Sequence, residues 1–266
     1  MKILTWNILA SEWIKKSYYP TVDKKILFDR KSRLKKIMER IMDEDPDILL
    51  LQEVMEMEYK TLYKHFQSKY HISILSPINW AKTNVETVSS ESGNVTLLKK
   101  TVFKTKTEIY EQPLDQNFGL YSLATFTYKN KKQSKQIHIF NIHLNDLHGQ
   151  TRNKQMNIIR AFAEKQTQKY CIIAGDFNQE FRATSRVYSL NGFTVHNKCA
   201  TYYIEKNMNI DNILTKGFVE EETTKISNNT THGKCNYVPL KVENGFKIYG
   251  SDHLPVSVYI NPVVKE

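Results

Sequence analysis

Residues 47–54 read Asp-Ile-Leu-Leu-Leu-Gln-Glu-Val, and this stretch decides how the chain folds. Its aliphatic run, residues 48–51, follows Pro46 and Asp47 directly. A continuous apolar run of this length is typical of a strand that is covered on both faces. Glu53 comes immediately after the run, where a carboxylate is costly unless it has a partner or a function. The stretch therefore predicts an interior strand with a chemically important group at its end.

The segments around this strand predict two helices and a second strand. Residues 29–44 predict an amphipathic helix, because apolar side chains recur at helical spacing on one face. Pro46 ends that helix. Residues 55–68 predict a second helix, and residues 2–8 predict a strand that opens the chain. The apolar stripe of the first helix consists of Leu34, Ile37, Met38, Ile41 and Met42.

The rest of the chain alternates in the same way. Residues 151–167 predict a helix, and neither a linker nor an internal repeat divides the chain. We therefore expect a single domain over residues 1–266. Strands with helices interspersed predict an α/β fold, a four-layer sandwich of two packed mixed β-sheets flanked by helices. The other predicted strands are residues 71–76, 94–99, 102–110, 120–128, 136–142, 169–174, 209–214 and 253–260.

Composition narrows the class of protein. The chain has 266 residues, of which 40% are hydrophobic, enough for one sizeable core. No apolar run approaches the ~18 residues that span a bilayer. The strand at residue 2 leaves no room for a signal peptide, so we expect an intracellular protein. The three cysteines form no CxxC pair, which favours reduced thiols over disulfides or a zinc site. We expect a monomer without an obligate protein partner.

The net charge of +10 favours a polyanionic partner, such as nucleic acid or an anionic membrane surface. The alternative is a lysine-rich protein whose charge serves solubility alone. In the loop over residues 11–28, lysines alternate with aromatic residues that could stack bases while the lysines bind phosphates. A solvated loop is an equally good interpretation. The aromatic candidates for substrate binding are Trp13, Tyr18 and Tyr19.

Polar residues with acid, base or ligand chemistry follow the predicted strands. Sites in α/β sheets are built where strands end, so we expect these side chains to meet. Carboxylate and amide oxygens suit Mg²⁺ or Mn²⁺ better than zinc. Hydrolysis of a phosphate ester needs such an ion, an activated water and donors for the phosphoryl charge. The residues are Asn7, Glu53, His143, Asp176, Asn178, Asp211, Asp252 and His253.

Six short motifs contain these polar residues and follow one another in a defined order along the chain. In chain order they are Thr5-Trp6-Asn7-Ile8, Leu51-Gln52-Glu53-Val54, Ile142-His143-Leu144, Gly175-Asp176-Phe177-Asn178, Ile210-Asp211-Asn212-Ile213-Leu214 and Ser251-Asp252-His253. In content and order they resemble the motifs of the endonuclease/exonuclease/phosphatase superfamily, which has the DNase I-like fold. The resemblance runs from residue 3 to residue 258.

The resemblance implies a role for each acidic residue. Glu53 resembles the principal Mg²⁺ ligand, with Asn7 and Asp252 beside it, and Mn²⁺ is expected to substitute. Asp176 resembles the carboxylate that orients or deprotonates the attacking water, and Asp211 the carboxylate that holds the catalytic imidazole. From the residues alone, Glu53 could instead cap the following helix, and Asn7 could be a turn asparagine.

The remaining candidates act on the substrate. His253 resembles the catalytic histidine, and Asn178 and His143 resemble groups that contact the phosphate. Asn94 and Asn145 are expected on the substrate side of the site. The alternatives are plain turn asparagines and, for His143, a hydrogen-bonded core histidine.

The first third of the chain looks like the deadenylase and nocturnin-like branch, because Pro46-Asp47-Ile48-Leu49 leads into Gln52-Glu53-Val54. Asn145-Asp146-Leu147 and Gly175-Asp176-Phe177-Asn178 depart from that branch. We expect a Mg²⁺-dependent phosphodiesterase acting on single-stranded RNA or DNA, with a deadenylase-like 3′ exonuclease as one form. The alternatives are a DNA-repair phosphodiesterase for abasic or tyrosyl-linked ends, a lipid or inositol phosphoesterase of the same fold, and a non-catalytic nucleic-acid-binding module.

Overall fold

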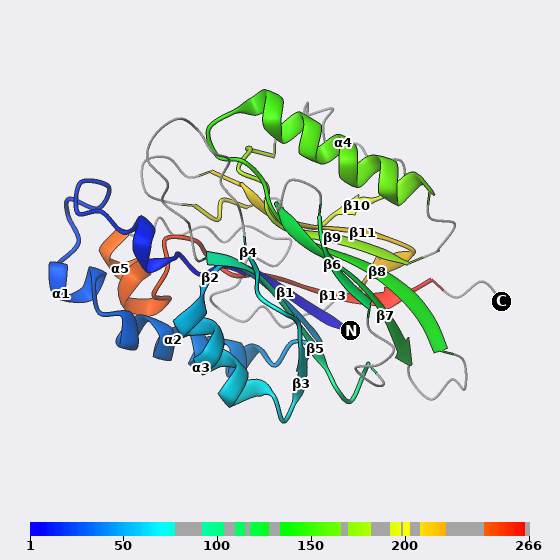
Figure 1. The fold of residues 1–266 in the computed structure, drawn as a ribbon, viewed down its shortest axis with the longest axis horizontal. Coiled ribbons are helices and arrows are strands. Elements are labelled where there is room, and N and C mark those ends of the chain that lie inside the picture. Colours follow the sequence, from blue (N-terminus) through cyan, green and yellow to red (C-terminus); the bar gives the residue numbers. More distant parts are fainter. Residues whose placement is uncertain are drawn as a thin grey trace.

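Two β-sheets stack face to face, and helices cover both outer faces (Figure 1). The computed structural model describes residues 1–77, 92–103, 110–114, 118–127, 134–165, 170–181, 192–197, 199–202, 208–221 and 242–263. The predicted four-layer α/β sandwich of two mixed sheets is confirmed.

The first sheet is built around the strand that contains the aliphatic run. This strand, β2 (Ile48–Met55), pairs parallel with β1 (Lys2–Asn7) and antiparallel with β5 (Ser92–Lys99). The sheet has seven strands, and the other pairs are antiparallel. Its remaining members are β13 (Val256–Pro262) and β12 (Phe218–Glu220) beyond β1, and β3 (Tyr70–Ile72) and β4 (Ser76–Pro77) against β5.

The second sheet has six strands and also contains one parallel pair. That pair is β8 (Ser134–His143) with β9 (Cys171–Asp176). Beyond β8 lie β7 (Gly119–Thr127) and β6 (Tyr110–Pro113), and beyond β9 lie β11 (Asp211–Lys216) and β10 (Thr194–Val195), all antiparallel.

The helices form the outer layers. On the first sheet lie α2 (Arg30–Glu44) and α3 (Glu56–Phe66), and on the second lies α4 (Gly149–Lys165) (Figure 1). Asp29 caps α2 by accepting a hydrogen bond from the Ser32 amide at 2.9 Å. Near one end of the sandwich lie the short helices α1 (Lys24–Leu27) and α5 (Val242–Ile248), together with the 3₁₀ turn η1 (Ser11–Trp13).

Side-chain alternation along β2 explains why its apolar run is continuous. Leu49 and Leu51 pack with the helices, in a cluster that includes Ile37 and Ile41 of α2. Ile48 and Leu50 point the other way, into the core between the two sheets. A strand in this position buries both faces, as its sequence predicts.

The layer between the sheets is apolar along most of its length and becomes polar toward one end. Gln52 Nε2 donates to Asn141 Oδ1 at 2.8 Å, which links β2 to β8 across the gap between the sheets. Asn141 Nδ2 in turn donates to the Leu51 and Val95 carbonyls at 3.2 and 3.0 Å. Buried amides that are paired in this way fix the two sheets relative to each other. They form a polar floor next to the strand ends.

Some local predictions differ from the structure. The loop predicted over residues 11–28 contains η1 and α1, and the sequence patterns did not predict α5. Polar, short helices of this kind lack the periodicity that identifies longer ones. Of the strand predicted over residues 102–110, residues 104–109 lie outside the described part, and β6 begins at Tyr110.

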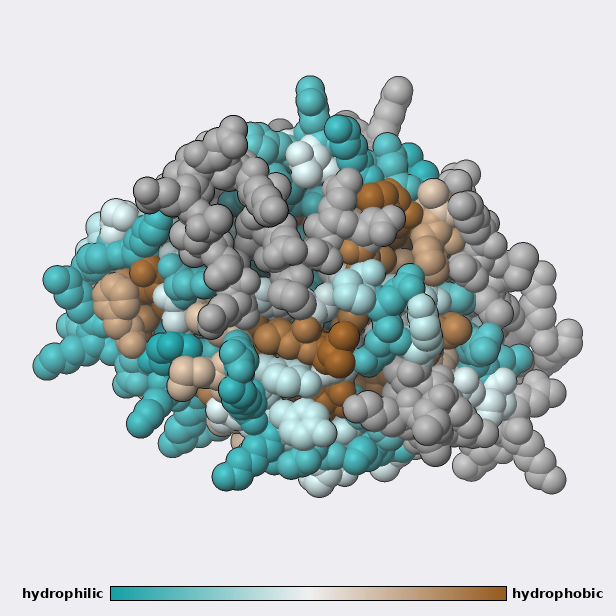
Figure 2. Space-filling model, viewed as in Figure 1, coloured by the Kyte–Doolittle hydropathy of each residue, from teal (hydrophilic) through white to brown (hydrophobic). Residues whose placement is uncertain are grey.

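The cysteines follow the prediction only in part. Cys171 is a buried free thiol. Cys199 is disulfide-bonded, so the expectation of a reduced thiol is wrong there. Spacing along the chain does not reveal which segments the fold brings together. In the part of the chain that the structure describes, no helix has the length and apolarity of a membrane span. The face shown in Figure 2 is mostly hydrophilic, with hydrophobic surface confined to smaller areas.

Gly175 allows β9 to approach β8 closely. Its φ is +144°, and a Cβ atom there would lie 1.9 Å from the Ile142 carbonyl oxygen. We expect Gly175→Ala to lower the free energy of unfolding by about 3 kcal/mol, measured by urea denaturation. Gly149→Ala is the matched control, because its nearest neighbour is Arg152 Nη2 at 3.6 Å. It should change stability by less than about 1 kcal/mol, and an equal loss in both variants would contradict the argument.

Candidate active site

The predicted catalytic and metal-binding residues converge at one end of the sandwich. The parallel pairs β1–β2 and β8–β9 each bring two carboxyl ends to the same edge of a sheet. β11 starts there, because Asp211 pairs with Asp176. The segment before β13 joins them through Ser251 Oγ, which donates to the Asn7 carbonyl at 2.8 Å. The residues at this end are Asn7, Glu53, His143, Asp176, Asn178, Asp211, Asp252 and His253.

Glu53 lies at an irregularity in β2. The register between β2 and β5 shifts between Leu51 and Val54, and Glu53 has a φ of +57°. This left-handed conformation turns the Glu53 carboxylate away from regular strand alternation. Its Oε2 accepts from the Ala10 amide at 2.8 Å. Burial and the negative charge of Asp252 raise the pKa of Glu53 to about 7, despite the hydrogen bonds it accepts.

The amide of Asn7 connects two of the carboxylates. Asn7 Nδ2 donates to Glu53 Oε1 at 2.8 Å and to Asp176 Oδ2 at 3.0 Å. Asn7 Oδ1 accepts from the Leu9 amide at 3.0 Å. Asn7 therefore lies beside the expected metal ligands, but its oxygen is already bonded to the backbone.

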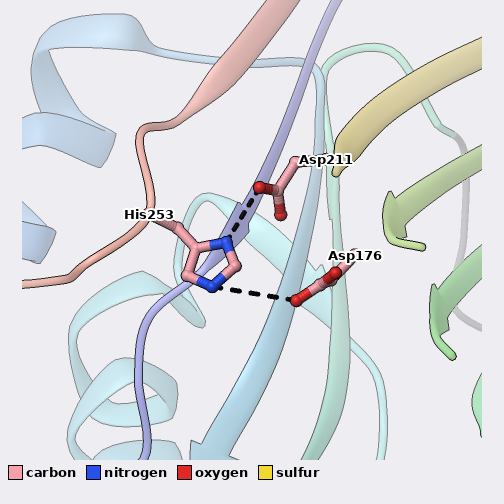
Figure 3. A group of neighbouring side chains, drawn as sticks. All are labelled: Asp176, Asp211 and His253. Atoms are coloured by element: carbon pink, nitrogen blue, oxygen red, sulfur yellow. Dashed lines mark hydrogen bonds and ion pairs between the residues drawn. The ribbon is translucent and has the colours of Figure 1, made fainter. Parts of the chain in front are cut away.

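His253 lies between two aspartates (Figure 3). Its Nδ1 donates to Asp211 Oδ2 at 2.8 Å, and its Nε2 is 3.8 Å from Asp176 Oδ2. Burial lowers the pKa of His253, but the charges of Asp211, Asp252 and Asp176 outweigh burial and hold that pKa well above its usual value. The expected pairing of Asp211 with the imidazole is therefore present, and it favours an imidazolium.

His143 is close to the same carboxylates but is not positively charged. Its Nε2 lies 3.6 Å from Asp176 Oδ2 and 3.9 Å from Glu53 Oε1. Burial and the charge of His253 lower the pKa of His143 to about 3. His143 therefore offers a neutral ring to a ligand at neutral pH, and His253 carries the charge.

Asp176 is held by the turn that follows β9. Asp176 Oδ1 accepts from the Asn178 amide at 2.7 Å, and Asn178 adopts a φ of +48°. Asn178 Nδ2 donates to the Leu144 carbonyl at 2.8 Å. Burial and the neighbouring charge of Asp211 raise the pKa of Asp176. A carboxylate with a raised pKa is a good proton acceptor near neutral pH.

Tyr19 has a different position from the one expected. Its hydroxyl donates to Asp252 Oδ2 at 3.1 Å, and its ring packs edge-on against Phe246 of α5. Only 3% of Tyr19 is exposed, so its ring is not available for stacking on a base. Tyr19 instead holds the Asp252 carboxylate. Its position among loop residues gave no signal of this contact.

Arg33 is a second residue of the site that sequence patterns missed. It lies on α2, is 3% exposed, and donates to backbone carbonyls of two loops. Its Nε binds the Gly250 carbonyl at 2.6 Å, and its Nη2 binds the Ile8 and Leu9 carbonyls at 3.0 and 2.5 Å. Arg33 thus fixes the loop after β1 relative to the loop that carries Asp252 and His253.

The contacts described for the other substrate-binding candidates are with residues outside the acidic cluster. Tyr18 is 54% exposed, with Lys15 Nζ 5.6 Å from its ring centroid, and Trp13 packs partly buried beside Ile14. Asn94 is buried, and its Nδ2 donates to the Asn141 carbonyl at 2.9 Å. Asn145 Oδ1 accepts from the Leu147 and His148 amides at 3.1 and 2.7 Å, as a turn asparagine does before α4.

The charge balance of the cluster suits a divalent cation. Glu53, Asp176, Asp211 and Asp252 are four acids, and His253 is the cation among them. Ligand atoms of Asp176, Asp211 and His253 lie within 4.8 Å of one another. We nevertheless favour Glu53 and Asp252 as metal ligands, because Asp211 and His253 are already bonded to each other. Carboxylate oxygens of this kind fit Mg²⁺ or Mn²⁺.

The fold and the acidic cluster at its strand ends define a DNase I-like protein. The model of the Endonuclease/Exonuclease/phosphatase family matches residues 4–253, and the chain belongs to this family of phosphoester hydrolases. The resemblance inferred from the motifs is therefore confirmed. No curated protein sequence matches the chain significantly.

Solved structures with low sequence identity share the fold. The human Nocturnin catalytic domain with bound sulfate is 18% identical, with a TM-score of 0.62 over 99% of this chain and 94% of that one. ANGEL2, a 2′,3′-cyclic phosphatase, in complex with adenosine-2′,3′-vanadate, is 13% identical, with a TM-score of 0.71 over 97% and 94%. TDP2 from D. rerio complexed with a single-strand DNA product is 16% identical, with a TM-score of 0.62 over 98% of both chains.

The raised pKa of Glu53 predicts how stability varies with pH in the absence of metal. The pKa of Glu53 rises from 4.5 to about 7 on folding, so the folded state binds the extra proton between these values. The stability linked to that proton is complete below about 4.5 and is lost as pH rises through about 7. We expect urea denaturation to show this loss, and Glu53→Gln to remove part of it. The exposed Glu39→Gln should keep the wild-type slope. An unchanged slope in Glu53→Gln would contradict the assignment.

The hydrogen bonds of Arg33 predict a large cost for a conservative change. Lysine cannot reproduce the planar fork that reaches the carbonyls of two loops. We expect Arg33→Lys to lower the free energy of unfolding by about 2–4 kcal/mol, because buried carbonyls lose charged donors. The control is Arg40→Lys on the same helix, where the guanidinium pairs with Glu44 at 2.7 Å. Lysine can still pair with Glu44 at that position, so the cost should be smaller than that of Arg33→Lys. Equal costs, measured by urea denaturation, would exclude a special role for Arg33.

Proposed function

We propose that this protein is a Mg²⁺-dependent phosphodiesterase that hydrolyses phosphodiester bonds in single-stranded nucleic acid. The observation that carries the proposal is the buried cluster in which the Asn7 amide donates to both Glu53 and Asp176, and the His253 imidazole lies between Asp176 and Asp211. A buried excess of carboxylates is costly unless a cation or a proton compensates it. Burial and neighbouring negative charge raise the pKa of both Glu53 and Asp176, as expected of carboxylates whose charge a bound cation would offset.

Glu53 and Asp252 would hold the metal ion, with Asn7 next to them. Bound Mg²⁺ supplies positive charge that neutralises the phosphoryl oxygens and the leaving oxygen. Tyr19 and Arg33 orient this set, Tyr19 through its bond to Asp252 and Arg33 through the carbonyls of both loops. Mn²⁺ has similar ligand preferences, and we propose that it substitutes.

Asp176 is the proposed base. It accepts a proton from the attacking water, whose oxygen forms a bond to phosphorus while the bond to the leaving oxygen breaks. The Asn7 amide and the Asn178 backbone fix the two oxygens of Asp176, which directs its remaining lone pairs into the site. Acid–base catalysis by such a group contributes about 10²- to 10⁴-fold in rate.

His253 is the proposed donor to the phosphoryl oxygens. Asp211 fixes the tautomer and the orientation of the His253 ring. This leaves Nε2 of His253 on the side of Asp176. The imidazolium favours the negative charge that develops in the transition state. His143, which is neutral, and Asn178 complete the set of groups around the phosphate.

A nucleic acid substrate is favoured by charge and by the similar proteins. The net charge of +10 attracts a polyanion. ANGEL2 is a 2′,3′-cyclic phosphatase, and a TDP2 structure holds a single-strand DNA product. A deadenylase-like 3′ exonuclease is one form of the proposed activity, and a repair phosphodiesterase is the second candidate, favoured by the likeness to TDP2. We further propose that the protein acts as an intracellular monomer.

The substrate test uses 5′-labelled single-stranded poly(A), mixed-sequence RNA and mixed-sequence DNA, each with Mg²⁺ and with EDTA. The matched variants are Glu53→Gln, which removes the ligand charge, and the exposed Glu39→Gln. Metal-dependent cleavage that is lost in Glu53→Gln and kept in Glu39→Gln supports the proposal. Survival of all three oligonucleotides would contradict a nuclease and direct the search to tyrosyl-linked ends and lipid or inositol phosphates.

The roles of Asp176 and His253 predict a loss of turnover without a loss of folding. We expect Asp176→Asn and His253→Ala each to lower kcat by about 10²- to 10⁴-fold. Single-turnover cleavage at saturating Mg²⁺ measures the rate, and thermal denaturation checks the fold. The effects should not add, because both groups act on the same transition state. Turnover near the wild-type value in either variant would refute its assigned role.

A further inference from the structure

A surface cavity of about 310 Å³ lies next to the proposed metal-binding residue Glu53. Its volume is at the lower end of the range of about 300–1,000 Å³ that is typical of ligand pockets. None of the groups that carry the proposed hydrolysis lies in its wall. The residues that line it are Ser11, Glu12, Ile14, Phe28, Arg30 and Met55.

Two residues that line this cavity are neighbours in sequence of Glu53 or of a residue that bonds it. Ser11 follows Ala10, whose amide donates to Glu53 Oε2 at 2.8 Å. Met55 is two residues beyond Glu53 in β2. A second, smaller cavity shares Ser11 and Arg30 with the first and is also lined by Glu53. Ser11 and Arg30 therefore connect the wall of the larger cavity to the surroundings of Glu53.

The cavity presents an aromatic ring. Phe28 is 49% exposed, whereas Ile14 is 7% exposed and forms apolar wall behind it. A single exposed apolar side chain is ordinary on a protein surface. Phe28, Ile14 and Met55 together, however, give one concave apolar surface, which suits a flat ligand that can stack.

Arg30 forms a fixed wall and is not a free phosphate site. Its guanidinium is held by Glu58, with Nη2 at 2.9 and 3.1 Å from the two carboxylate oxygens and Nε at 3.3 Å from Oε1. Nη2 is also 3.9 Å from Met55 Sδ. Because Glu58 neutralises Arg30, the guanidinium offers no free positive charge to an anion in this cavity. The planar face of a paired guanidinium still stacks well on a ring.

We propose that this cavity binds the base of the nucleotide next to the scissile phosphate, with Phe28 as its stacking platform. The inference rests on the proposed nuclease function and specifies where the substrate lies. Stacking on an aromatic side chain accepts every base, because each base has a π-face. The cavity therefore sets the position of the strand, and the polar side chain of Ser11 at its wall offers a hydrogen-bond partner to a base edge.

The test measures binding of a single-stranded oligonucleotide in Mg²⁺, by fluorescence anisotropy, in the slow-cleaving Asp176→Asn background. Stacking contributes roughly 1–3 kcal/mol per base, so Phe28→Ala should weaken binding by about 5- to 150-fold. Phe28→Trp should restore affinity. The salt dependence of binding should stay the same, because Phe28 carries no charge. The control is Tyr110→Ala, an aromatic residue of β6 that is 55% exposed, and it should bind like the parent.

An oligonucleotide series with one abasic position shifted along the strand identifies the base. One abasic position should weaken binding to the parent protein as much as Phe28→Ala does and should cost nothing further in that variant. An affinity of Phe28→Ala equal to that of the parent overturns the inference, as does a loss that no abasic position reproduces. If the wild-type protein neither binds nor cleaves oligonucleotides, the nuclease function itself fails. If it cleaves them and Phe28→Ala cleaves equally well at limiting substrate, only the base site fails.

Discussion

The buried carboxylates of Glu53, Asp176, Asp211 and Asp252 repel one another. The other contacts of the site offset this repulsion. Four acids in one water-poor space are stable only when donors, protons or a cation compensate their charge. The fold supplies donors from several directions, and Glu53 and Asp176 each accept hydrogen bonds from two of them. Asp211 is paired with His253, Asp252 with Tyr19, and both Glu53 and Asp176 with the one amide of Asn7. The charge that remains is the physical basis of the proposed affinity for a cation and for a proton from water.

Rigid supports hold this cluster in place. The polar floor of Gln52 and Asn141 fixes the two sheets, so carboxylates from β2 and β9 keep their separation. Arg33 fixes the loops above that floor. The left-handed backbone of Glu53 and of Asn178 is tolerated because neighbouring hydrogen bonds stabilise it. The strained backbone at these two residues costs conformational free energy, but it places the carboxylate oxygen atoms at defined positions. Transition-state stabilisation requires such defined positions.

Much of the fold followed from local patterns. The run at residues 48–51 identified an interior strand, and the stripe on residues 29–44 identified α2, because burial on one or two faces leaves a period in the sequence. Short elements such as α1 and α5 were missed, since one or two turns are too short to show a helical period. Residues of the cluster were found because chemistry-bearing side chains after apolar strands have few structural explanations. The substrate-binding candidates were weaker, because a loop aromatic such as Tyr19 looks the same whether its ring is buried or exposed.

Burial patterns and motifs along the chain were enough to predict the fold class, the family and which acids and histidines lie at the strand ends. Tertiary structure alone decided their partners: His253 with Asp211, Tyr19 with Asp252, Arg33 with the carbonyls of two loops, and Phe28 with a cavity beside Glu53. These contacts join segments that are separated by up to 233 residues. Their formation depends on strand register and loop path, and neither leaves a periodic signal in the residues involved. The spacing of apolar residues shows how each segment is buried. The geometry of the site depends instead on which segments the folded chain brings together.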